Sequence, residues 1–166
     1  IVFAALDPDL ARTEPDPEIH ALIHDSAGLN LALDYLPGSV SYDPLVHRLP
    51  AELASRIVWF DAYVTNVDRT PRNTNMLMWH RAPWLIDHGA TRYFHHSPDW
   101  AADAGRATRA FPGIADHVLL PQAAMLEAVD EAMASAIERQ TIERVLAQVP
   151  DEWLTGEGLL PAPARD

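Results

Sequence analysis

Three polar side chains in one short stretch are spaced so that they could do chemistry together. Asp68 and Asn73 stand five positions apart, and Asp87 follows fourteen positions after Asn73, two before Gly89. Phosphoryl transfer from ATP needs one carboxylate that faces the acceptor hydroxyl and oxygen ligands for the Mg²⁺ that neutralises the phosphates. Asp and Asn are common in turns, so the prediction depends on the ordered set rather than on any one residue.

The elements around these residues are those that such a site requires. A helix is predicted from Pro50 to about Asn66, because Pro is favoured at a first helical position and apolar residues recur at helical spacing. Residues 76–79 and 84–86 are predicted as two short strands joined by a tight turn. The expected order is therefore helix, loop, hairpin and second acidic loop, with Asp61 anchoring the first loop through hydrogen bonds.

The rest of the chain alternates short strands with helices, which predicts an α+β fold. We expect no regular structure in the proline-rich segment 7–17, and strand 1–6 to be buried on at least one face. The remaining predicted elements are a helix at 18–26, a strand at 29–36, helices at 99–110, 121–140 and 141–148, and a loose tail at 156–166.

Composition excludes several classes of function. The chain has 166 residues, no cysteine and a net charge of −12, and all 12 of its basic residues are arginines. Thiolate chemistry, a lysine-containing P-loop and a Schiff-base lysine are excluded within this chain. Without clustered positive charge or a long apolar run, we expect no nucleic-acid binding, no membrane span and a cytoplasmic location.

The polar segment resembles the HipA-like kinases and is more distantly similar to phosphatidylinositol kinases. The resemblance rests on Asn66 to Asn73 together with the Ile-Asp-His-Gly run at 86–89. Residues 30–38 look like the last strand of the N-lobe and the hinge of that family. The similarity covers residues 28–96 well.

This resemblance implies a protein-kinase-like fold with a mostly helical C-lobe that carries a small hairpin. Residues 1–38 would be a remnant of the N-lobe strands and the hinge, residues 39–155 the C-lobe, and residues 156–166 the loose tail. The chain would transfer the γ-phosphate of ATP to a hydroxyl, on a protein Ser or Thr or on a small molecule.

The resemblance also implies roles for individual residues. Asp68 would be the catalytic aspartate, and Arg69 would neutralise charge near the phosphates or pair with an acid. Asn73 and Asp87 would hold Mg²⁺, and Asn75 would assist the metal or cap the loop. The remaining implied contact is with the adenine of ATP, made by the backbone at Asp34, Tyr35 and Leu36.

Two features depart from a complete kinase. No Gly-rich loop precedes residue 28, and the chain contains no Lys that could bind the α- and β-phosphates. In the family these elements lie upstream of the hinge, so we expect the chain to be a fragment that is inactive alone. A non-catalytic pseudokinase or interaction module is the alternative explanation.

A metal-dependent phosphohydrolase is a further alternative. It would use Asp87-His88 or Asp116-His117 together with His95 or His96. Such sites present their ligands from helices, whereas Asp87 is predicted to follow a strand, so the kinase interpretation is preferred.

Overall fold

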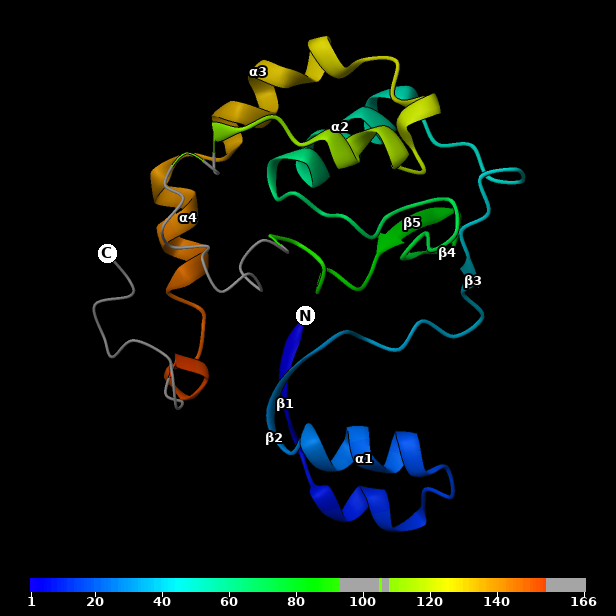
Figure 1. The fold of residues 1–166 in the computed structure, drawn as a ribbon, viewed down its shortest axis with the longest axis vertical. Helices are drawn as coiled ribbons and strands as arrows, with labels where there is room; N and C mark the ends of the chain where they lie inside the picture. Colours follow the sequence, from blue (N-terminus) through cyan, green and yellow to red (C-terminus); the bar gives the residue numbers. More distant parts are fainter. Residues whose placement is uncertain (93–104, 106–107, 155–166) are drawn as a thin grey trace. The chain divides into compact units, whose positions relative to one another are not determined.

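The computed structural model describes residues 1–92, 105 and 108–154, and the chain divides into two compact units (Figure 1). The first unit comprises residues 1–37 and 145–166, and the second comprises residues 38–144. Both contain helices and strands, which confirms the α+β class. That the first unit is a remnant of a kinase N-lobe stays a prediction.

In the first unit, two antiparallel strands pair with each other, and two helices lie between them in the sequence. Val2 pairs with Ala32 and Leu6 with Gly28 at the two ends of the ladder. The Trp153 indole also belongs to this unit and donates a hydrogen bond of 2.9 Å to the carbonyl of Leu29. The elements are β1 (Val2–Leu6), η1 (Pro8–Thr13), α1 (Pro17–Asp25), β2 (Gly28–Ala32) and η7 (Asp151–Leu154).

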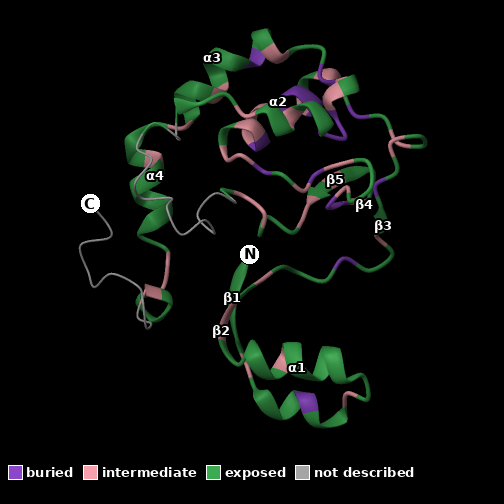
Figure 2. Cartoon of the chain, in the orientation of Figure 1, coloured by how far each residue is buried: buried purple, intermediate pink, exposed green. Residues whose placement is uncertain are grey.

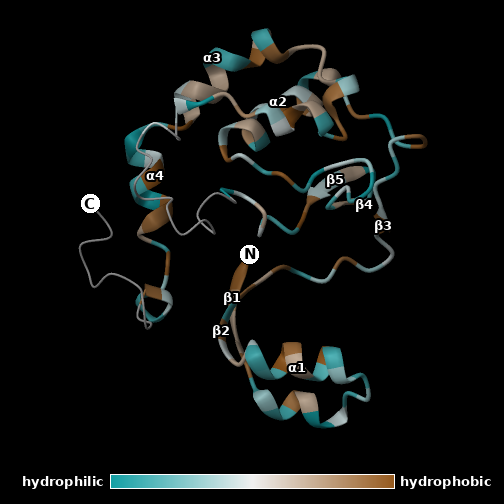
Figure 3. Cartoon of the chain, viewed as in Figure 1, coloured by the Kyte–Doolittle hydropathy of each residue, from teal (hydrophilic) through white to brown (hydrophobic). Residues whose placement is uncertain are grey.

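The structure corrects three predictions in this unit. β1 forms as predicted, but its expected buried face is wrong, since Val2 is 59% and Phe3 48% exposed. Figure 2 shows the strand mainly in the colour of exposed residues, although it contains hydrophobic residues (Figure 3). The predicted irregular segment 7–17 is wrong as well, because it contains η1: Pro8 occupies the first turn, where a missing N–H breaks no hydrogen bond. The predicted strand 29–36 ends at Ala32, where its pairing with β1 ends.

The second unit combines a small antiparallel sheet in the order β3-β4-β5 with α2 and several shorter helices. It contains the whole segment from Asp61 to Gly89 that sequence analysis singled out. Its elements are β3 (Val40–Ser41), α2 (Ala51–Tyr63), β4 (Met76–Trp79), β5 (Ala82–Leu85), η5 (Pro112–Asp116), η6 (Leu120–Gln122), α3 (Leu126–Ala136) and most of α4 (Arg139–Leu146).

The predicted hairpin that separates the two loops of the site is confirmed, although its second strand covers Ala82–Leu85 rather than 84–86 and its turn has only two residues. β4 and β5 pair antiparallel from Met76–Leu85 to Trp79–Ala82. The two turn residues, His80 and Arg81, have φ of 48° and 65°, the left-handed conformation that matches the twist of a two-residue hairpin. A two-residue turn fixes the register of β4 and β5, and this register places the loop before β4 beside the loop after β5.

The helix α2 forms the centre of the second unit and packs against α3 and η6. Its buried face includes Ile57, Val58 and Asp61. Ser55 ties α2 to the start of α3, because its Oγ accepts a hydrogen bond of 2.9 Å from the backbone N–H of Met125. The buried core cluster consists of Tyr42, Leu49, Ala54, Ile57, Val58, Met76, Val118, Leu119 and Ala123.

The helical C-terminal part differs from the sequence prediction in its boundaries. The helix predicted at 121–140 is wrong at both ends, since α3 begins only at Leu126, after η6, and ends at Ala136. A second helix follows as predicted, but it starts at Arg139 rather than Thr141. The predicted tail 156–166 and most of the predicted helix 99–110 lie outside the described residues. Among the described helices, none is long and apolar enough to cross a membrane.

The core of the second unit predicts a sharp contrast between two leucines. Leu119 is 0% and Leu45 is 88% exposed. Leu119→Ala should lower the free energy of unfolding by about 2–5 kcal/mol, because it leaves a cavity, whereas Leu45→Ala should change it by less than about 0.5 kcal/mol. Urea denaturation followed by circular dichroism measures both. Equal losses for the two variants would contradict the placement of the core.

Candidate functional site

Asp68 and Asn73 lie in contact in the loop that follows α2. Asn73 Nδ2 donates to Asp68 Oδ2 at 2.8 Å. Asn75 Nδ2 donates to the same oxygen at 3.1 Å and to the backbone carbonyl of Asp68 at 2.9 Å. The structure therefore brings two of the predicted residues together, and two amides fix the orientation of the Asp68 carboxylate. Of the two roles expected for Asn75, the cap of the loop is confirmed.

Beneath this loop lies a fully buried carboxylate, Asp61, at the end of α2. It is 0% exposed and accepts hydrogen bonds from three side chains. Arg69 Nε lies 2.6 Å and His117 Nε2 lies 2.9 Å from Oδ2, and Asn66 Nδ2 lies 3.1 Å from Oδ1. The prediction that Asp61 anchors the loop by hydrogen bonding is confirmed.

Arg69 connects this anchor to the segments on either side. Its guanidinium, 1% exposed, donates to the backbone carbonyl of Asn75 and lies 3.3 Å from Nε2 of His88. Its own carbonyl accepts the N–H of Val118 at 3.0 Å. One side chain thus holds the loop before β4 and the loop after β5. Its expected pairing with an acid is confirmed, while its action near the phosphates stays a prediction.

The third predicted residue, Asp87, follows β5 directly. The N–H of Ile86 donates to the carbonyl of Asn75 at 3.0 Å, so the residue before Asp87 is bonded to the loop that carries Asp68. Asp87 has φ of 48°, and its Oδ1 accepts the Gly89 N–H at 3.4 Å. This local turn leaves the Asp87 carboxylate exposed beside the first loop.

Left-handed backbone conformations occur at the ends of both loops. Thr65, Asn75 and Asp87 have φ of 52°, 45° and 48°. Asn and Asp adopt this region more readily than other residues with a Cβ, whereas a β-branched residue such as Thr does so rarely. The hydroxyl of Thr65 is also buried without a hydrogen-bond partner among the described residues. Strain of this kind persists only where the surroundings fix the backbone.

The charges of the site shift two pKa values. Burial raises the pKa of Asp61, but the hydrogen bond from His117 and the charge of Arg69 outweigh it, so the net pKa lies below the ordinary value. Burial lowers the pKa of His88, and the neighbouring Arg69 lowers it further. A neutral His88 agrees with the geometry, because its Nε2 can then accept a hydrogen bond from the guanidinium.

His117 is the part of the site that sequence analysis missed as an anchor. Its Nδ1 accepts the backbone N–H of Leu119 at 3.0 Å, so its proton is on Nε2, which donates to Asp61. Because it follows Asp61 by 56 positions, no local spacing could indicate this contact. Both ring nitrogens are used, which removes His117 from the ligand set of the phosphohydrolase alternative.

Of the other residues of that alternative, the described ones, Asp87, His88 and Asp116, do not form a recognisable metal site. Within residues 1–92, 105 and 108–154, no three His, Cys, Asp or Glu side chains are grouped so that they could hold an ion. His95 and His96 lie outside the described residues. The metal ligands predicted for the kinase interpretation, Asn73 and Asp87, are not such a group of three, and one of the two is an amide; their role stays a prediction.

The predicted hinge residues belong to the first unit. Asp34 and Tyr35 are exposed in an irregular segment after β2, whereas Leu36 is buried. Their backbone contact with adenine stays a prediction.

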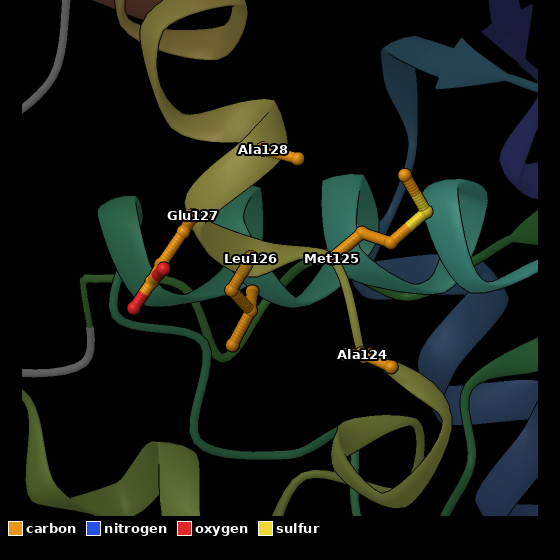
Figure 4. Close-up of a pocket in the computed structure, with 6 residues that line it drawn as sticks. Ala124, Met125, Leu126, Glu127 and Ala128 are labelled. Atoms are coloured by element: carbon orange, nitrogen blue, oxygen red, sulfur yellow. The ribbon is translucent and has the colours of Figure 1, made fainter.

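A pocket of about 710 Å³ opens elsewhere, where α3 begins (Figure 4). Met125, Leu126 and Glu127 line it together with alanines 123, 124 and 128. None of the predicted site residues contributes to this pocket, so it is separate from the chemistry of the two loops.

Comparison with known families decides the assignment. The profile of the HipA-like kinases matches residues 38–162, which is most of the chain and includes the whole second unit. The chain belongs to the HipA-like kinase family. No curated protein and no solved structure matches it. Membership of the HipA-like kinases suggests a phosphotransferase of the kinase type, and the region matched contains Asp68, Asn73 and Asp87.

The buried anchor gives a pH-dependent prediction. Asp61→Asn should lower the free energy of unfolding at pH 7 by about 3–5 kcal/mol, because it leaves the buried Arg69 without a counter-charge. The pKa of Asp61 is below its ordinary 3.8 in the folded chain, so its stabilising effect is complete above that pH and is lost as pH falls through the folded pKa. The difference between wild type and variant should therefore shrink in acid.

Urea titrations at pH 7 and at successive lower pH values measure this difference. Glu52→Gln is the matched control, because it breaks the exposed pair with Arg56 on the same helix and should cost less than about 1 kcal/mol. A constant difference at all pH values would be inconsistent with an ionised Asp61.

Proposed function

We propose that this chain is the catalytic part of a kinase that transfers the γ-phosphate of ATP to a hydroxyl group, on a protein Ser or Thr. The observation that carries the proposal is the contact between Asp68 and Asn73, held above the Asp61–Arg69 pair in a member of the HipA-like kinases. A carboxylate and an amide at this spacing are what a kinase catalytic loop uses.

Asp68 would act on the acceptor. Two amide groups hold its Oδ2, and no described residue donates a hydrogen bond to its Oδ1. The Oδ1 atom can therefore accept the hydrogen bond of an acceptor hydroxyl and orient that oxygen for attack on the γ-phosphorus. As the new O–P bond forms and the bond to the β-phosphate oxygen breaks, the hydroxyl proton moves to Asp68.

Asn73 and Asp87 would hold Mg²⁺. Asn73 uses its amide nitrogen on Asp68, so its amide oxygen is the atom that can face a cation. The exposed carboxylate of Asp87 is a second hard oxygen donor, and the backbone bond between Ile86 and Asn75 keeps the two loops adjacent. When bound, Mg²⁺ would neutralise negative charge on the phosphates of ATP.

Arg69 would be a positioning residue that holds the two loops of the site in place. Its guanidinium is enclosed by Asp61, Asn75 and His88, so its contacts favour holding the two loops over touching the phosphates. The adenine would meet the backbone of residues 34–36, a contact that rests on the resemblance to the hinge of the family.

Three aspartate-to-asparagine variants of the full-length gene product test the proposal. Asp68→Asn and Asp87→Asn should each lower the rate of phosphate transfer from labelled ATP and Mg²⁺ by about 10²–10⁴-fold, because each removes a charge that the reaction needs. Asp116→Asn is the matched control: this aspartate is exposed and should leave the rate within about twofold.

The acceptor is read from the labelled component, either the protein itself or a protein of a cell extract. Release of labelled inorganic phosphate without any labelled acceptor, lost in Asp116→Asn and retained in Asp68→Asn, would overturn the proposal in favour of the phosphohydrolase. Nucleotide binding detected by thermal shift, with equal silence of wild type and variants in transfer, would identify a pseudokinase instead.

A further inference from the structure

A second pocket lies on the opposite end of the hairpin from the catalytic loop. It has a volume of about 400 Å³ and is formed by β3, the end of β4, the hairpin turn and the loop before α2. Its lining residues are Val40, Val46, His47, Arg48, Met78 and Arg81, all of the second unit. None of them belongs to the site described above.

The loop that forms one wall is held by its own hydrogen bonds. Asp43 accepts the N–H of Leu45 on its carboxylate at 2.8 Å and the N–H of His47 on its carbonyl at 2.8 Å. The N–H of Asp43 donates in turn to His47 Nδ1 at 3.0 Å, so a neutral His47 carries its proton on Nε2. The imidazole also stacks on the buried Tyr42 ring, with 5.5 Å between the ring centres. The wall is therefore ordered before any ligand arrives.

The charge of this pocket is opposite to that of the chain. The chain carries 24 acidic and 12 basic residues, yet the pocket is lined by two arginines and a histidine and by no acidic side chain. Arg48 and Arg81 form no ion pair with any residue that the structure describes. Two guanidinium groups at one pocket, neither paired with an acidic group of the described residues, favour a ligand with carboxylates. Each guanidinium fork can bind a carboxylate with two hydrogen bonds.

The pocket also presents apolar surface and an open strand edge. Val40 is 55% and Val46 is 71% exposed, and Leu45 beside them is 88% exposed. Apolar side chains that an ordered loop holds toward solvent are typical of an interaction site. Beside them, β3 is an edge strand, paired only with β4 within the described sheet. An edge of this kind can accept an extended peptide as a further strand.

We propose that this pocket is a docking site for an extended acidic segment of a partner protein, with carboxylates for Arg48 and Arg81 and an apolar side chain for Val40, Val46 and Met78. In a strand, alternate side chains face the same way, so the segment would place acidic and apolar residues at every second position. The occupant binds away from Asp68, and the proposal does not depend on phosphate transfer.

Fluorescence polarisation with a labelled nine-residue peptide tests the docking site. The peptide carries glutamate, leucine, glutamate and leucine at its even positions and threonine at its odd positions; in the control peptide, glutamine replaces glutamate. Arg48→Gln and Arg81→Gln should each weaken binding of the acidic peptide by about tenfold, the loss of a charge-assisted hydrogen bond. Val46→Asp should abolish it.

Arg139→Gln is the matched control, because it removes the same charge from an exposed pair with Glu143 on α4 and should change binding by less than about twofold. All four side chains are on the surface, and urea unfolding verifies that the variants fold. Equal binding of the glutamine peptide, or equal weakening by Arg139→Gln, would overturn the proposal. Binding of glutarate as tight as that of the peptide would also overturn it, because the pocket would then be a site for small anions. A dimer seen in sedimentation that Arg81→Gln dissociates would overturn it as well, because the occupant would then be a second copy of the chain.

Discussion

The buried ion pair between Asp61 and Arg69 is the interaction on which the rest of the site depends. Removing two charges from water is costly, and an ion pair is tolerated in the interior only where further hydrogen bonds satisfy both partners. Here Asn66 and His117 donate further hydrogen bonds to the Asp61 carboxylate, and backbone carbonyls accept hydrogen bonds from the Arg69 guanidinium. The polar network replaces a hydrophobic core at this point and determines one arrangement of the loops around it.

Four chain segments meet at this pair: the end of α2, the loop that carries Asp68, the loop after β5 and the segment before η6. Each contributes a polar group that would be unsatisfied if another moved away. Among the described residues, the hydrogen bonds of the exposed Asn73 and Asp87 stay within their own loops, to Asp68 and Thr70 for Asn73 and to Gly89 for Asp87. The position of Asn73 relative to Asp87 is therefore fixed by the buried network of Asp61, Arg69 and His117, which lies beneath the two loops.

Sequence analysis could find the parts of this site that are local. Asp68, Asn73 and Asp87 follow from spacing, and the hairpin between them follows from two apolar runs and a tight turn. Asp61 was expected as an anchor because it lies one helical turn or more before the loop. The contact with His117 could not be found, since it joins residues far apart in sequence through an irregular segment.

The errors in the fold have similar causes. Three prolines predict no regular structure in residues 7–17, yet Pro8 lies at the start of η1, where Pro is tolerated. The helix predicted to begin at Pro121 starts later because the chain first forms η6, a difference in hydrogen-bond pattern that apolar periodicity does not reveal. The run of apolar residues at 1–6 predicts a buried face for β1, but burial depends on what packs against a strand.

The register of the β4–β5 hairpin limits how this region can change during evolution. In each strand, successive side chains alternate between faces, and the carbonyl of Asn75 pairs with the N–H of Ile86 just beyond the ladder. A single-residue insertion within β4 or β5 would turn the following side chains to the other face and carry Asp87 out of register with the first loop. Insertions and deletions in the strands would therefore be removed by selection for activity at Asp68 and Asp87, whereas a change in the turn at His80–Arg81 would act on the second pocket and leave this register intact.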